Sequence, residues 1–479
     1  MVKAQFLFIL TSLSIIAIQI RNTFYDYDDQ QMAMIIMLLV AYAYILHLVQ
    51  HKATFGKITY FSFSFLFPFG FLIVYFQLAV LDFFGFSVVS QFETFIWGVN
   101  NNISKTISLA GLGIVAFFLG THTKPSTYIK DYKKFEYSKS LVQALTLLGW
   151  IFYILLLLNS GTYIFGAYAF TEDTWFASYA AKLFNVCLFS AISVELYRVY
   201  QSNNQVSFLS YLGSFSLPLL ILTAIHTAFS IFVGDRGPVI TYSILITSVY
   251  FIKFYQLSFF KVVIIVLLSS SFFTILGEAR TRVLGEGFID RFTLATETVA
   301  VSKFFDTTVP GSNFVELAAS VRTLAVSVRD VPEEFGYQYG MFQIQQLVSV
   351  IPYFQSLLLN LVYDGNPIYD GSANFITYLI HRGPVGYGDG SSVIADLYLD
   401  FGVTGAVVVM FLFGLFISRI EIDFFSGNIR FGFRYLIFLT FLANAIYLSR
   451  STLMLEFSQI VLSYFLIRFI IYFQNQRLK

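Results

Sequence analysis

Arginine residues in three short segments of this sequence have the type and spacing expected of an anion-binding site. Arg236 lies in the turn-forming segment GDRGP, Arg280 and Arg282 lie in EARTR, and Arg450 lies in LSRST. A guanidinium group is always charged and contacts two phosphate oxygens at once. Several such groups at one depth of the fold therefore predict a pyrophosphate-binding site.

A structural role is the alternative for each of these arginines. Arg236 directly follows Asp235, and Glu278 precedes Arg280 and Arg282 within about one helical turn, so local ion pairs would fix each loop. Scattered structural pairs have no reason to share a depth in the fold. Arginines that form one binding site must lie at the same depth.

Two aspartates form a second candidate group. Asp396 and Asp400 are four residues apart, so they lie on one face of a helix just before an apolar run. One of them is a candidate general base for a sugar hydroxyl. In the alternative interpretation, both carboxylates cap and orient that helix.

Histidines supply the remaining candidates. His226 lies eight residues before Gly234, about 12 Å along a helix. It either accepts a proton or binds a sugar, or it simply bonds a neighbouring helix. His381 and Arg382, in a glycine-rich segment, have the same two interpretations. The sequence contains no recognisable metal cluster, Walker loop or Ser-His-Asp arrangement, so neither a metal nor another cofactor is expected.

The elements that must position these residues are membrane helices. The 479 residues are 57% hydrophobic and 12% charged, whereas a soluble domain carries roughly 25% charged residues. Cys187 is the single cysteine and lies in an apolar run, which rules out an intrachain disulfide. The N-terminal apolar run lacks a small-residue cleavage site, so an uncleaved first helix is expected.

About twelve apolar intervals are long enough to be candidate spans, each expected to be a helix. They are 4–20, 32–49, 60–81, 103–120, 141–158, 176–195, 208–232, 239–252, 262–275, 401–417, 434–448 and 455–472. The predicted fold class is therefore an all-α polytopic membrane protein. Residues 1–275 hold nine spans, 276–400 form a large extracytoplasmic loop, and 401–479 hold three spans.

The large loop has its own predicted organisation. Residues 313–329 and 339–363 show apolar positions typical of helices, the second interrupted at Pro352, and are expected to be interfacial or re-entrant. Residues 364–390 contain six glycines and two prolines, which favours a surface loop over a site.

The distribution of basic residues predicts the orientation. Of the 29 lysines and arginines, seven lie in 276–400, Lys182 lies within the sixth interval, and four lie in short outer loops: Arg21, Lys105, Arg236 and Arg450. The other seventeen then lie on the cytoplasmic side, as the positive-inside rule requires. Both termini are therefore predicted to be cytoplasmic, and 276–400 to face outward.

Cysteine labelling tests this orientation. In a Cys187→Ser background, a cysteine at Asn366 should react with a membrane-impermeant thiol reagent in intact cells, because residue 366 is predicted to face outward. A cysteine at Lys133 should not react. The reverse labelling pattern would contradict the predicted topology.

The order of several motifs resembles the Wzy-type polymerases of bacterial surface polysaccharides. These motifs are the GDRGP turn that opens a membrane helix, the arginines after the ninth span, and later Arg322-Thr323-Leu324, Val331-Pro332, Tyr339-Gly340 and Ile351-Pro352. The run from Ser391 to Gly405 and the arginine between the last two spans are also similar to that family. The resemblance covers about residues 226–455, and Asp396 stands where the family usually has glutamate.

The resemblance implies a GT-C-like glycosyltransferase of the bacterial inner membrane. Such an enzyme would transfer a growing glycan from undecaprenyl pyrophosphate to a new lipid-linked repeat unit outside the cytoplasm. The implied clamp for the leaving pyrophosphate is Arg236, Arg280 and Arg450, which would make a metal unnecessary. With Asp396, these are the predicted catalytic residues. The residues predicted to bind substrate are Asp235, Arg282, Arg291, His226, His381 and Arg382.

The implied partners are the undecaprenyl-pyrophosphate-linked glycan and membrane lipid, with no nucleic acid. Whether a protein that regulates chain length is also a partner stays open. Two other functions remain. A flippase or other transporter for lipid-linked oligosaccharides has a similar number of spans, but it usually has matching halves. An O-antigen ligase would use the same donor with a different acceptor.

Overall fold

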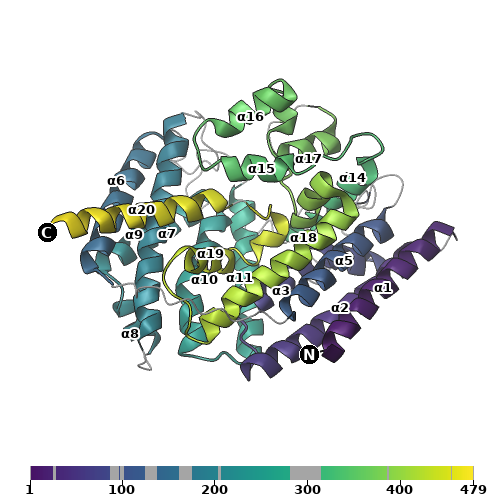
Figure 1. The fold of residues 1–479 in the computed structure, drawn as a ribbon, viewed down its shortest axis with the longest axis horizontal. Helices are drawn as coiled ribbons and strands as arrows, with labels where there is room; N and C mark the ends of the chain where they lie inside the picture. Colours follow the sequence, from purple (N-terminus) through teal and green to yellow (C-terminus); the bar gives the residue numbers. More distant parts are fainter. Residues whose placement is uncertain are drawn as a thin grey trace.

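The computed structural model describes residues 2–24, 29–86, 97, 102–123, 137–160, 175–202, 207–280, 314–383, 385, 388–454 and 456–477. Within these ranges the regular elements are all helices (Figure 1). This confirms the predicted fold class of an all-α polytopic membrane protein.

The helices before the long loop follow the predicted apolar intervals. They are α1 (Val2–Phe24), α2 (Asp29–Phe55), α3 (Phe63–Phe83), α5 (Ile103–Thr121), α6 (Lys139–Leu158), α7 (Trp175–Gln201), α8 (Phe208–Gly213), α9 (Leu217–Val233), α10 (Arg236–Lys253) and α11 (Phe259–Arg280).

The later helices begin with the short elements of the long loop. They are α13 (Val315–Ala318), α14 (Val321–Asp330), α15 (Met341–Val348), α16 (Phe354–Tyr363), η3 (Pro367–Tyr369), α17 (Ser372–His381), α18 (Val393–Phe425), α19 (Phe433–Ala443), η4 (Tyr447–Arg450) and α20 (Phe457–Arg477).

Nine helices in the described ranges are long and apolar enough to cross a membrane: α1, α2, α3, α5, α6, α7, α11, α18 and α20. The other three predicted intervals are also helical but differ in detail. Residues 208–232 form two helices, α8 and α9, because the chain bends between Gly213 and Pro218, and a proline opens a helix more readily than it continues one. Interval 239–252 is α10, and interval 434–448 divides into α19 and η4.

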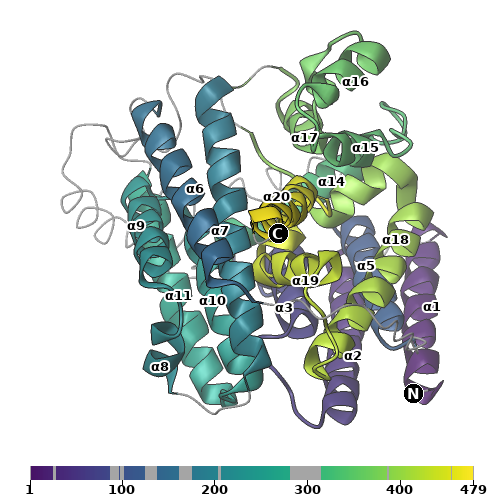
Figure 2. The ribbon, with the colours of Figure 1, turned by 60° about the vertical axis from the view of Figure 1, so that its left-hand side comes forward.

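The core of the bundle is α5, which is buried along most of its length and packs along α18. Figure 2 shows α1, α2, α5 and α18 on one side and α6, α7, α9, α10 and α11 on the other, with α3, α19 and α20 between them. Apolar side chains such as Phe6, Leu13, Leu38 and Leu268 remain exposed. This exposure suits helices that face lipid.

Helices α14 to α17 form a lobe above the bundle in Figure 2, which we call the cap. The two helical stretches predicted in the loop are present, and the second is divided between α15 and α16 at Ser349–Tyr353, around Pro352. In place of a predicted surface loop, residues 372–381 form α17. Phe375, Ile376 and Leu379 lie at helical spacing and are fully buried, which outweighs the surrounding turn residues.

Helix α18 contains 33 residues, about 50 Å of helix and more than a bilayer core requires. It breaks at Gly402, whose φ of 66° is in the left-handed region that glycine tolerates. The break separates the segment that carries Asp396 and Asp400 from the part that begins where the tenth span is predicted.

Candidate active site

The turn between α9 and α10 sets the position of Arg236. Gly234 ends α9 with a φ of 84°, and the Asp235 carboxylate accepts a hydrogen bond of 3.1 Å from the Gly237 amide at the start of α10. Asp235 therefore acts as the N-cap of α10, and Arg236 is the first residue of that helix. The GDRGP sequence encodes this turn directly.

Arg450 ends the short helix η4, which is held from two sides. The Tyr75 hydroxyl of α3 donates to the Ser449 carbonyl (3.3 Å), and the Thr452 hydroxyl donates to Gln346 of α15 (2.8 Å). Just before η4, the chain passes so close to α3 that a Cβ on Gly70 would lie 2.5 Å from the Ile446 carbonyl oxygen. The Arg450 turn is thus fixed between α3 and the cap.

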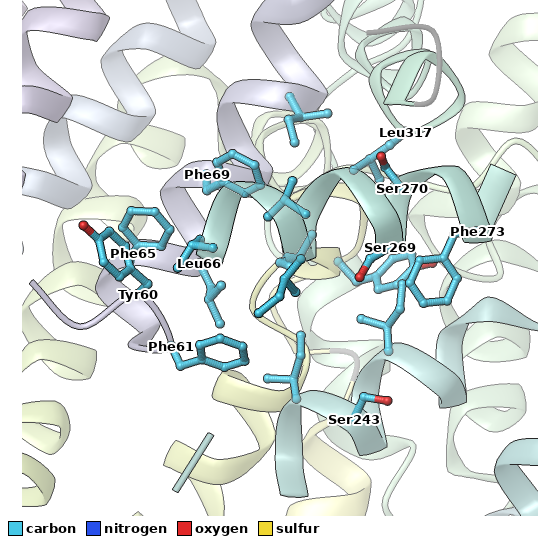
Figure 3. Close-up of a pocket in the computed structure, with 18 of the residues that line it drawn as sticks. Tyr60, Phe61, Phe65, Leu66, Phe69, Ser243, Ser269, Ser270, Phe273 and Leu317 are labelled. Carbon is cyan, nitrogen blue, oxygen red and sulfur yellow. The ribbon is translucent and has the colours of Figure 1, made fainter. Parts of the chain in front are cut away.

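Arg236 and Arg450 line the same cavity, of about 380 Å³, which we call the arginine cavity. Its walls come from α3, α10 and α11, with Phe314, Leu317 and η4 completing the lining. Figure 3 shows its apolar part, where Phe61, Phe65 and Phe69 face Ser269 and Phe273. Most of the lining is aromatic or aliphatic, so this space suits a hydrocarbon chain.

The two arginines lie toward one end of the arginine cavity. Arg236 begins α10, whereas Phe251, another lining residue, lies fifteen residues later, about 22 Å along the helix. The turn that carries Arg450 lies near the same end of α10, because Thr241 donates a hydrogen bond of 3.0 Å to Asn444, three residues before η4. A charged end and a long apolar body match a phosphorylated lipid.

The other predicted clamp residues are only partly described. Arg280 is the last residue of α11, about 10 Å along the helix from the lining residue Phe273. Its side-chain position is not described. Arg282 and Arg291 lie outside the described residues.

Asp396 and Asp400 share a helix face, as their spacing predicts, and this face is buried under α15. The Asp400 carboxylate accepts hydrogen bonds from the amides of Phe342 (3.2 Å) and Gln343 (3.0 Å), which caps the first turn of α15. Asp396 accepts a hydrogen bond from the Gln343 side chain. Both aspartates are fully buried and do not line the arginine cavity, so their contacts fit the orienting role.

His381 lies in the cap and contacts an acid. Its Nε2 is 2.7 Å from Asp389 Oδ2, and Arg322 donates to the other oxygen of Asp389 at 3.4 Å. All three side chains are partly exposed: His381 to 20%, Asp389 to 17% and Arg322 to 15%. This His–Asp–Arg group does not line the arginine cavity.

Arg382 braces the cap. Its guanidinium donates two hydrogen bonds to Glu334, at 2.8 and 2.7 Å, lies 2.9 Å from Asp330 and sits over the ring of Phe335. The neighbouring Arg329 also donates to Asp330, and this bond raises the pKa of Arg329. These contacts join α14 to the end of α17.

His226 is buried among aromatic rings of α6, α7 and α10. Its ring centroid lies 4.7 Å from that of Phe184, 5.6 Å from that of Tyr242 and 5.8 Å from that of Tyr153. Neither ring nitrogen has a hydrogen-bond partner among the described residues. His226 does not line the arginine cavity, and its contacts are those of a core side chain.

Two positioning residues, Tyr75 and Gln346, were not among the sequence candidates. A tyrosine in an apolar run and a glutamine in a short helix carry no pattern of their own. Their partners, Ser449 and Thr452, are more than a hundred residues away.

A comparison with protein families identifies the chain. Residues 2–478 match the family described as O-antigen polysaccharide polymerase Wzy. The chain belongs to this family. Among curated proteins and among solved structures, no match to this polymerase is found.

Membership confirms the family that the motifs resemble, and the match extends beyond residues 226–455 to nearly the whole chain. Wzy polymerases join O-antigen repeat units, so this protein is a transferase of polysaccharide biosynthesis that acts on lipid-linked repeat units. Together with the membrane-spanning helices, membership makes it a multi-pass protein of the inner membrane.

Proposed function

We propose that this Wzy polymerase takes a growing glycan on undecaprenyl pyrophosphate and transfers its reducing end to a new lipid-linked repeat unit. The reaction takes place at the outer face of the inner membrane. The observation that carries this proposal is the arginine cavity, where Arg236 and Arg450 lie toward one end of a long apolar space. A polyprenyl chain fits the apolar body, and its pyrophosphate fits the arginines.

The arginines give the site its chemistry. As the bond between the anomeric carbon and the pyrophosphate oxygen breaks, negative charge develops on the leaving group. Arg236 and Arg450 stabilise that charge. Arg280, the last residue of the third cavity helix, is the proposed third member of the clamp. Arg282 and Arg291 are proposed to assist the clamp.

The other predicted residues then act at a distance from the pyrophosphate. Asp235 fixes Arg236 through the N-cap of α10, and Asp396 orients α15, whose Gln346 holds the Arg450 turn. His381, with Asp389 and Arg322, offers hydrogen-bonding groups for glycan on the cap. Arg382 supports this surface through Glu334.

Deletion of the gene tests the proposed activity. Single lipid-linked repeat units should accumulate, long chains should disappear, and each repeat unit should stay complete, because only the joining step is lost. The measurement is the length distribution of lipid-linked glycan and its distribution between the leaflets. Repeat units trapped on the cytoplasmic leaflet would favour a flippase, and long lipid-linked chains that fail to reach their final acceptor would favour a ligase.

A further inference from the structure

A second cavity, of about 160 Å³, adjoins the turn that carries Arg450; we call it the glutamate cavity. Helices α18 and α19, the start of α20 and η4 enclose it. Tyr447 of η4 lines both this cavity and the arginine cavity. The turn η4 therefore lies between the two cavities. Helices α3, α10 and α11 surround the arginine cavity, and α18, α19 and α20 surround the glutamate cavity.

The walls of the glutamate cavity are mainly aromatic. Phe413 and Phe416 come from α18, Phe441 from α19 and Phe457 from α20. Phe416 is 42% exposed, so this wall of the cavity also forms part of the surface of the helix bundle. Aromatic walls with a few polar groups are typical of a pocket that orients a ligand.

Most of the polar side chains in this cavity are already engaged. Thr440 donates to a carbonyl of its own helix, Asn444 accepts from Thr241, and Thr452 donates to Gln346. The Glu456 carboxylate differs, since it has no hydrogen-bond or ion-pair partner among the described residues. The described lining includes no lysine or arginine, so this acid faces the cavity without a counter-charge.

We propose that Glu456 is the general base of the polymerisation reaction and that the glutamate cavity receives the sugar that carries the acceptor hydroxyl. This assignment rests on the proposed function of the arginine cavity. The hydroxyl proton passes to the Glu456 carboxylate while the hydroxyl oxygen bonds to the anomeric carbon of the donor. The bond from that carbon to the pyrophosphate breaks, and its electron pair leaves with the pyrophosphate.

The arrangement of the two cavities suits a single displacement. The attacking hydroxyl and the leaving pyrophosphate lie on opposite sides of the anomeric carbon, so the base and the anion clamp must flank the donor sugar. Arg450 and Glu456 are six residues apart on one connection, and each faces a different cavity beside η4. Apolar surroundings disfavour the charged carboxylate and make it a stronger proton acceptor.

A structural role for Glu456 makes a different prediction. Glu456 immediately precedes α20, where an acid stabilises the helix N-terminus by about 0.3–1 kcal/mol. Removing its charge would then lower the stability of the protein slightly. The rate of polymerisation per folded molecule would not change.

The test uses the full-length protein in lipid nanodiscs with a labelled undecaprenyl-pyrophosphate-linked repeat unit. Glu456→Gln should polymerise about 100-fold more slowly or worse, while it still binds the labelled lipid through the arginine cavity. Glu456→Asp should lose less. The matched control is Asp423→Asn, which removes an acid paired with the exposed Arg434 at the far end of α18 and should leave the rate unchanged.

A second measurement separates proton transfer from folding. Formate, a small carboxylate, should restore part of the lost rate to Glu456→Ala but not to Arg450→Ala. A Glu456→Gln rate equal to that of Asp423→Asn, or a loss that only follows the amount of folded protein, would overturn the role of Glu456 and leave the arginine cavity intact. Failure of the wild-type protein to use the lipid pyrophosphate would instead overturn the proposed function on which this role depends.

Discussion

Replacing Arg236, Arg280 or Arg450 by alanine is expected to slow polymerisation about 10- to 100-fold. A hydrogen bond to a charged group contributes about 1.5–3 kcal/mol, and a site that excludes water favours the upper end. Losing about 1.4–2.7 kcal/mol of transition-state stabilisation corresponds to that range of rates. Arg236 and Arg450 line an apolar cavity, so little water competes for the pyrophosphate.

Lysine variants test whether the geometry of the guanidinium group matters as well as its charge. Lysine keeps the positive charge but cannot contact two phosphate oxygens in a fixed plane, so each Arg→Lys variant should be impaired less than its alanine counterpart. The rate should be measured in nanodiscs, and chain length and the amount of membrane-inserted protein in cells. Normal chain lengths from two or more of the three alanine variants, at normal expression, would contradict the clamp.

A purely structural role for these arginines would give another pattern. If Arg236 only fixed its turn, its loss would reduce the amount of protein without changing the activity per molecule. Removing the neighbouring acid as well would then restore part of that amount. Asp235 already caps α10 through the Gly237 amide, so the double variant would also lose this cap. The single Arg236 variants are therefore the more informative comparison.

The position of Arg236 could be predicted from the sequence because its determinants are local. A glycine that tolerates positive φ, an aspartate that caps a helix and an apolar run that follows are all adjacent in the chain. The helices were predictable for the same reason, since length and hydropathy are local properties. Where a local signal was mixed, as in 364–390, burial of Phe375 and Leu379 decided in favour of helix α17.

The two cavities could not be predicted, because their shape depends on contacts between distant segments. Phe65, Ile240 and Val266 line the arginine cavity from three separate helices, and no sequence pattern predicts that these helices lie together. In the sequence, Glu456 is only an acid at the start of an apolar run, and this does not predict a functional role. It becomes a candidate base only once the structure shows that it lines a cavity and that its carboxylate has no hydrogen-bond or ion-pair partner among the described residues.

The aspartates show how a correct local inference can leave a role undecided. Their spacing of four residues correctly predicts a shared helix face, but it does not say what covers that face. In the structure, α15 covers it, and the two carboxylates bond to Gln343 and the amides around it. The choice between general base and helix cap therefore depends on the docking of another helix, which the sequence does not reveal.

A side chain at Gly414 is expected to remove most of the folded protein from the membrane. Helix α18 packs so closely on α5 that a Cβ on Gly414 would lie 2.2 Å from the Phe117 carbonyl oxygen. In the same interface, a Cβ on Gly120 would lie 2.1 Å from the Phe411 carbonyl oxygen. Each clash involves backbone, so it cannot be relieved by a rotamer change. Small residues allow such close approach of membrane helices.

Gly414→Val should destabilise the protein by about 3 kcal/mol or more, at or beyond the upper end of the cost of overpacking a core. Gly120→Ala should act in the same direction, because both glycines serve one interface. Gly213→Ala is the matched control, since a Cβ there meets no atom within 4 Å. Thermal unfolding of detergent-purified protein and the yield of monodisperse protein measure the effect. If Gly414→Val matched Gly213→Ala in both measurements, α5 and α18 could not be packed as closely as the structure has them.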